Sequence, residues 1–94
     1  MRIDKWLWAA RFFKTRTLAA EFVEKRRIRL TRSGLESRLD KPARPVKVGD
    51  RLVFALGGRV VAIVVEALGE RRGPAEEARR LYSTLGGDGD APPL

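Results

Sequence analysis

The chain has 94 residues and carries twenty Lys and Arg side chains against twelve Asp and Glu, so its formal net charge at pH 7 is +8. It contains no cysteine and no histidine, which excludes a disulfide framework, a thiolate metal site, a thiol nucleophile and the usual general base. A chain of this length forms one domain at most. We therefore expect neither catalysis nor a cofactor nor a metal ion.

The positive charge is concentrated in the first half of the chain. Residues 1–51 hold fifteen basic and six acidic side chains, whereas residues 52–94 hold five and six. A one-sided basic surface is typical of a protein that binds a polyanion, and we favour nucleic acid over an anionic membrane. The longest apolar run, residues 60–65, is far shorter than the roughly 20 residues of a membrane span. No targeting signal is visible, and we expect a soluble, cytoplasmic protein.

The first predicted element is an amphipathic helix over residues 3–13, where apolar side chains recur at spacings of three and four. Trp6 and Phe13 share one face of this helix, and we expect that face to be core. Trp8 and Phe12 lie on a different face. One of them could be partly exposed and stack on RNA bases, and the sequence does not decide between these roles for Trp8.

A second helix is predicted over residues 16–26. Thr15 is a good N-cap for it, because the hydroxyl can accept a hydrogen bond from a free backbone amide. Its apolar stripe consists of Leu18, Ala19, Phe22 and Val23. The link between the two helices is so short that they must pack as an angled pair.

The elements after the second helix are mostly strands. In chain order we expect a strand around 28–30, a turn at 31–34, an extended segment over 41–50, a strand over 52–56, a hairpin turn at 57–58, a strand over 59–68 that is buried over 60–65, and a short helix over 74–85. These elements predict an RNA-binding core over 1–56, a hairpin strand and helix over 57–85 packed on the same domain, and a disordered tail over 86–94.

The basic residues fall into three groups along the chain. The groups are Arg11, Lys14 and Arg16 at the link between the helices; Lys25, Arg26, Arg27 and Arg29 at the end of the second helix and on the following strand; and Lys41, Arg44 and Lys47 in the extended segment. The Thr15 hydroxyl and the first amides of the second helix add a natural phosphate site. A solvated face paired with Glu21, Glu24 and Asp40 accounts for only part of these charges, because acids are few in this half.

Two stretches of the sequence resemble a known family. "RIDKWLWAARFFKTRTLAAEFVE" followed by a short basic strand and "KPARPVKVGDRLVF" resembles the S4 RNA-binding domain, also called the alpha-L motif. "DKWLWAARFFKTR" together with "ERRGPAEEARRLY" resembles the ribosome-associated heat shock protein 15 family, and the likeness covers about residues 2–85. The fold class is therefore expected to be α+β, with two packed N-terminal helices against a small mixed β-sheet and a C-terminal helix.

The resemblance implies a non-catalytic protein that binds structured RNA. The expected partner is ribosomal RNA of the large subunit, with tRNA as a further one, in a ribosome-associated stress response or rescue of stalled nascent-chain complexes. Carried over by position, the binding residues are Arg2, Lys5, Arg11, Lys14, Thr15 and Arg16, with the basic residues around Arg27 beside them. The family usually has a glycine where the second helix ends, and its following hairpin turn looks shorter than "LTRSGLESRLD". We expect a monomer.

Two alternative functions stay open at this point. A basic surface does not distinguish RNA from DNA, so a DNA-binding module is the first. The second is a subunit that docks on a protein through Trp8 and residues 71–85. If the protein binds RNA, we expect Arg11→Ala combined with Arg16→Ala to weaken RNA binding and to leave the melting temperature nearly unchanged.

Overall fold

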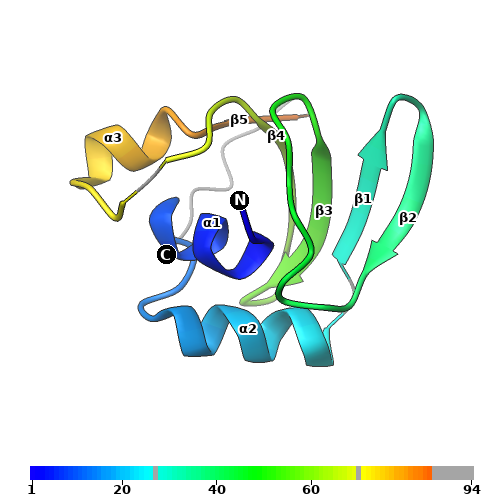
Figure 1. Ribbon diagram of the computed structural model, residues 1–94, viewed down its shortest axis with the longest axis horizontal. Helices are drawn as coiled ribbons and strands as arrows, with labels where there is room; N and C mark the ends of the chain where they lie inside the picture. The colour runs from blue at the N-terminus through cyan, green and yellow to red at the C-terminus, as the bar shows by residue number, and fades with distance from the viewer. Residues whose placement is uncertain (27, 70, 86–94) are drawn as a thin grey trace.

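The computed structural model describes residues 1–26, 28–69 and 71–85 (Figure 1). Its elements are α1 (Ile3–Ala9), α2 (Arg16–Lys25), β1 (Ile28–Arg32), β2 (Leu35–Leu39), β3 (Arg51–Leu56), β4 (Arg59–Val65), α3 (Ala75–Arg79) and β5 (Tyr82–Thr84). The strands form one sheet in the order β2-β1-β3-β4-β5. The predicted α+β class is confirmed. The predicted mixed sheet is wrong, because each strand runs opposite to its neighbours.

The core lies between the helices and one face of the sheet. Ile3 and Leu7 of α1 and Val23 of α2 are fully buried, in one cluster with alternate residues of the strands. In Figure 1, α1 lies beside the central strands and α2 runs beneath it. Because the helices cover one face of the sheet, residues on β1, β3 and β4 alternate between buried and more exposed positions.

Helix α1 is shorter than the predicted helix over 3–13, and it ends because Arg11 turns the chain. Arg11 has φ of +67°, a left-handed conformation that breaks the helix. The turn directs Phe12 into the core, where its ring centroid lies 4.9 Å from that of Tyr82 and 5.7 Å from that of Phe54. A left-handed non-glycine residue costs on the order of 1–2 kcal/mol, and burial of Phe12 offsets that cost.

The aromatic residues of α1 and its following turn are mostly core. Trp6 is fully buried, as predicted, and its Nε1 donates a hydrogen bond to the carbonyl of Ala67 at 2.8 Å. Phe12 is also buried, whereas Phe13 is half-buried with its ring against Phe22. The sequence predicted Phe13 rather than Phe12 in the core, and the structure has the reverse, because both residues follow the end of α1. Trp8 is half-buried and packs against the core.

Helix α2 begins as predicted and ends one residue earlier. The Thr15 hydroxyl accepts a hydrogen bond from the Leu18 amide at 3.0 Å, which confirms the predicted N-cap. Arg26, the C-cap, is extended, with φ of −113°, so the helix ends here without a glycine in a left-handed conformation. The Leu18 side chain is 47% exposed and lies outside the buried stripe that the sequence predicted.

The predicted hairpin turn at 57–58 is confirmed, and the predicted turn at 31–34 is a tighter hairpin turn at Ser33 and Gly34. Ser33 and Gly34 form a two-residue turn with positive φ, and the chain then continues as β2, a strand that the sequence pattern did not predict. Gly57 and Gly58 also have positive φ, and they join β3 to β4. The predicted strand after them is shorter, and its burial alternates, so that Val60 is 69% exposed.

An ion pair fixes the extended segment over 41–50 to the sheet. Arg32 of β1 donates to both oxygens of the Asp50 carboxylate, Nε to Oδ1 at 2.8 Å and Nη2 to Oδ2 at 2.7 Å. The Asp50 carboxylate is buried, and it also accepts the Lys47 amide at 2.8 Å. Arg32 reaches the Pro45 carbonyl as well, at 3.3 Å. These bonds hold the segment in place despite its two prolines.

The ionised Asp50 carboxylate is expected to stabilise the fold less as the pH falls. Burial would raise the pKa of this carboxyl, but the hydrogen bonds from Arg32 and from the Lys47 amide outweigh burial and lower the pKa below 3.8. Because the folded-state pKa is the lower one, the stabilisation is present above about pH 3.8 and is lost as the pH falls through the folded-state value. Urea midpoints between pH 6 and pH 2 should fall less steeply for Asp50→Asn than for the wild type. Parallel profiles would contradict the assignment.

The predicted helix over 74–85 is wrong in its length. Helix α3 ends at Arg79, and β5 then pairs with β4, with Tyr82 opposite Val65. The chain leaves the helix because Leu81 is buried and its carbonyl accepts the amides of Glu66 and Ala67. The predicted tail, residues 86–94, lies outside the described residues. No helix in the described ranges is long and apolar enough to cross a membrane.

Candidate RNA-binding surface

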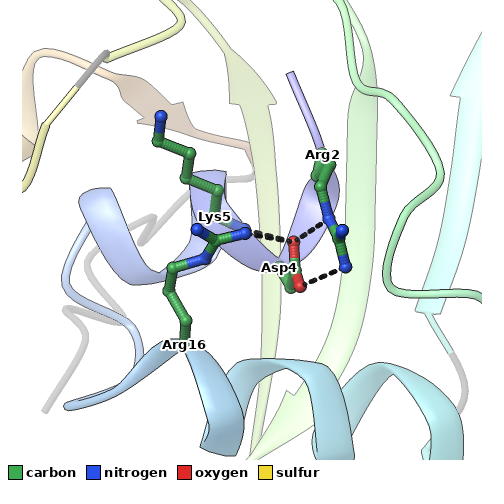
Figure 2. A network of polar contacts seen from close by, with 4 residues as sticks. All are labelled: Arg2, Asp4, Lys5 and Arg16. Atoms are coloured by element: carbon green, nitrogen blue, oxygen red, sulfur yellow. Dashed lines mark hydrogen bonds and ion pairs between the residues drawn. The ribbon is translucent and has the colours of Figure 1, made fainter.

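A buried carboxylate organises the surface at the start of α1. Asp4 lies in the first turn, and its side chain is only 5% exposed. It accepts two hydrogen bonds from Arg2, from Nε at 3.0 Å and from Nη2 at 2.9 Å, and a third from the Lys5 backbone amide at 2.7 Å (Figure 2). This bidentate pair fixes the guanidinium plane of Arg2 while half of the side chain stays exposed.

The first residue of α2 reaches the same carboxylate. Arg16 Nη2 lies 3.8 Å from Asp4 Oδ1, and the Arg16 side chain is 44% exposed. Figure 2 shows the Lys5 side chain beside Arg16 and pointing away from the carboxylate. Arg2 and Arg16 thus flank one buried acid, and together with Lys5 nearby they leave a net charge of +2. We call Arg2, Lys5 and Arg16 the helix corner.

Lys14 and Thr15 lie on the turn that leads into this corner, and both are exposed. The Thr15 hydroxyl is engaged in capping α2, so its first role is structural. The exposed Lys14 can add a charge to the same side of the molecule, because it is two residues from Arg16. The two predicted residues thus directly precede Arg16 in the chain, and both are exposed.

Arg11 has a structural role that the sequence did not reveal. Its side chain is half-buried, and Nε donates to the Gly73 carbonyl at 2.9 Å, which ties the end of α1 to the segment before α3. Arg72 acts similarly, with Nη2 3.4 Å from the Phe13 carbonyl. Arg11→Ala should therefore lower the melting temperature. This corrects the expectation that Arg11→Ala with Arg16→Ala would leave it nearly unchanged.

The third basic group lies beside the helix corner. The Ile3 amide donates to the Arg44 carbonyl at 2.8 Å, and Arg2 forms a bridge with Pro45, so the extended segment runs along the start of α1. Lys41 and Lys47 are exposed on that segment, and Arg44 is half-buried. The Arg32–Asp50 pair holds this segment and thereby positions its charges.

The second basic group lies at the other end of α2. Lys25 and Arg26 are exposed there, and Arg27 lies outside the described residues. Arg29 follows on β1 and is 60% exposed, 4.0 Å from the Glu36 carboxylate. A ten-residue helix is about 15 Å long, so this group is well separated from the helix corner.

Sequence reasoning missed two exposed arginines, Arg38 of β2 and Arg51 of β3. The strand register places Arg38 directly opposite Arg29 and Arg51 opposite Thr31. The alternation of apolar and polar residues in "LESRL", directly after the Ser33–Gly34 turn, could have predicted β2 and thereby placed Arg38 on a strand. Without a predicted β2, the strand that carries Arg38 beside β1 could not be assigned.

Comparison with known proteins identifies relatives over most of the chain. The S4 domain family model matches residues 1–30, which contain α1, α2 and the helix corner. Heat shock protein 15 of Escherichia coli K12 is 42% identical over 82 residues, which cover 87% of this chain and 58% of that protein. The RQC P-site tRNA stabilizing factor of Listeria innocua is 39% identical over 85 residues, which cover 90% and 86%. This chain thus spans 58% of the E. coli protein's length.

A solved structure has the same fold. It is the trimeric structure of Vibrio cholerae heat shock protein 15, which superposes with a TM-score of 0.79 at 36% sequence identity. The match covers 90% of this chain and 81% of that one. The agreement extends through the helices and the sheet, well beyond the 30 residues of the S4 match.

Proposed function

This chain belongs to the family of S4-domain proteins that includes heat shock protein 15 and the RQC P-site tRNA stabilizing factors, and on that premise we propose that it binds structured RNA on the ribosome without catalysing a reaction. The observation that carries the proposal is the helix corner. A buried acid there holds the Arg2 guanidinium through two hydrogen bonds at an exposed surface, and the Arg16 guanidinium from α2 lies 3.8 Å from the same carboxylate. The S4 match covers these same residues.

The helix corner suits the phosphate backbone of RNA. A guanidinium group donates two parallel hydrogen bonds to phosphate oxygens, and Asp4 orients Arg2 before the ligand arrives, with Arg16 close by. Lys5 and the basic residues of the extended segment add positive charge nearby. Such contacts supply affinity and orientation rather than sequence readout, so binding should weaken steeply with salt.

The ligand that we propose is ribosomal RNA of the large subunit together with tRNA in the P site, in rescue of stalled nascent-chain complexes. The support is the name of the Listeria relatives, which describes stabilisation of P-site tRNA, and the share of those proteins that this chain covers. The place of action would be the cytoplasm, where these complexes form. We keep the monomer as a proposal, and light scattering would test it against the trimer of the V. cholerae structure.

Competition between nucleic acids tests the choice of RNA. We expect a labelled rRNA hairpin bound to the protein at moderate salt to be displaced by unlabelled hairpin RNA at a lower concentration than by duplex DNA of equal length. Equal displacement would favour the DNA-binding alternative. A protein partner captured after nuclease treatment would instead favour docking through Trp8 and residues 71–85.

A further inference from the structure

In the part of the chain that the structure describes, the sheet face opposite to the one that packs on the helices is open. Every second side chain along β1–β4 points to the core, as Leu30, Leu52 and Ile63 do. Their neighbours along each strand point to the other side, and these neighbours are exposed or half-buried. The register of the strands therefore identifies which residues lie side by side on the open face.

The open face is strongly basic over β2, β1 and β3. Arg38 and Arg29 are directly opposite one another on β2 and β1. Arg51 on β3 is opposite Thr31, which places it diagonally next to Arg29. Strands lie about 4.8 Å apart and residues along a strand about 3.4 Å apart, so three exposed arginine side chains stem from three adjacent strands within about 12 Å. We call Arg29, Arg38 and Arg51 the sheet row.

Acidic side chains do not balance the sheet row. Among the described residues of these three strands, Glu36 is the one acid on the open face, and it lies 4.0 Å from Arg29 with 61% of its side chain exposed. Such an exposed contact is worth little. Two like charges directly opposite one another destabilise a sheet. A local arrangement that costs stability in this way is expected where a charged ligand compensates for it.

We propose that the sheet row is a second phosphate-binding surface, which takes a segment of RNA backbone different from the one at the helix corner. The complementary charge is that of a polyanion, because three closely spaced guanidinium groups suit successive phosphates. The second surface lies beyond the end of α2, about 15 Å from the helix corner along that helix. The protein thus bridges two RNA segments. This inference rests on the proposed function in one respect, namely that the ligand is RNA.

A matched pair of double variants tests the sheet row. Arg38→Gln with Arg51→Gln removes two of its charges, and Arg79→Gln with Arg80→Gln removes two exposed charges at the end of α3. Affinity for purified large-subunit rRNA is measured by filter binding at several KCl concentrations. We expect the first variant to bind at least tenfold more weakly than the second. The slope of log K against log salt should be shallower by about 1.4–1.8. The melting temperature of the Arg38 and Arg51 variant should not fall, because the substitution removes the repulsion between Arg38 and Arg29.

The outcomes separate the two proposals. Equal affinities and equal salt slopes for the two double variants, with strong binding by the wild type, would overturn the sheet row alone. Failure of the wild type to bind rRNA would overturn the proposed function. Ultraviolet crosslinking adds a direct test, because removal of the sheet row should abolish crosslinks to nucleotides other than those lost when the helix corner is changed. Loss of crosslinks to the same nucleotides in both variants would overturn the bridging of two segments. An acidic protein that binds at the sheet row, with no change in RNA binding on its removal, would overturn it as well.

Discussion

Asp50→Ala is expected to lower the free energy of unfolding by about 3 kcal/mol, which is a large part of the total for so small a domain. The substitution removes the acceptor of three hydrogen bonds, two from Arg32 and one from the Lys47 amide. The value lies at the low end for a broken buried pair, because Arg32 is 33% exposed and can regain water. Urea denaturation at pH 7 measures the change.

A double-mutant cycle separates the pair from its surroundings. Arg32→Leu combined with Asp50→Ala should be more stable than Asp50→Ala alone, since replacing both charges removes the stranded guanidinium. Glu36→Ala is the control for an exposed pair, because its contact with Arg29 is long and solvated, and it should change stability by less than about 0.5 kcal/mol. Similar losses for Glu36→Ala and Asp50→Ala would show that burial of the pair is not what matters.

Lys5→Gln combined with Arg16→Gln is expected to weaken binding to structured RNA on the order of 100-fold, from about 1.5 kcal/mol for each lost charge-assisted hydrogen bond. The substitutions spare the Arg2–Asp4 pair, so the buried carboxylate keeps its main partner. The salt slope should become shallower by about 1.4–1.8, as for two lost phosphate contacts. Filter binding over a KCl series measures both quantities.

The control for this variant has the same loss of charge elsewhere. Arg79→Gln with Arg80→Gln lies on α3 and should change affinity only by the small effect of net charge. Thermal melts of both variants should resemble the wild type. An affinity for the Lys5 and Arg16 variant that matches this control would remove the helix corner from the binding surface.

Several local features were predictable from the sequence because they depend on neighbouring residues alone. The Thr15 cap, the glycine turn at 57–58 and the alternation on β1 and β3 are confirmed. The concentration of basic residues in the first half also suggested a polyanion ligand before any geometry was known. The resemblance to the S4 domain supplied the fold class, which composition could not.

Other features depend on contacts far along the chain, and the sequence pattern did not predict them. Periodicity extended the predicted helix to residue 13, because Phe13 falls on the face of Trp6, but the chain turns at Arg11 and places Phe12 in the core beside Tyr82. Helical propensity likewise hid the short β5, which forms only because β4 offers it an edge. The roles of the arginines diverge for the same reason. Arg11 meets Gly73, and Arg32 meets Asp50, each through a partner that its neighbours do not indicate.

The hydrogen bond from Trp6 to Ala67 joins residues 61 positions apart, and it has a consequence for the order of folding. The helix corner is encoded in the first 16 residues, yet the core beneath it includes Ile63 and Val65 of β4. A seven-residue helix has little stability of its own. During synthesis, α1 can reach its final position only after residue 67 has left the ribosome. The helix corner is therefore completed only after the strands that follow it along the chain have been made.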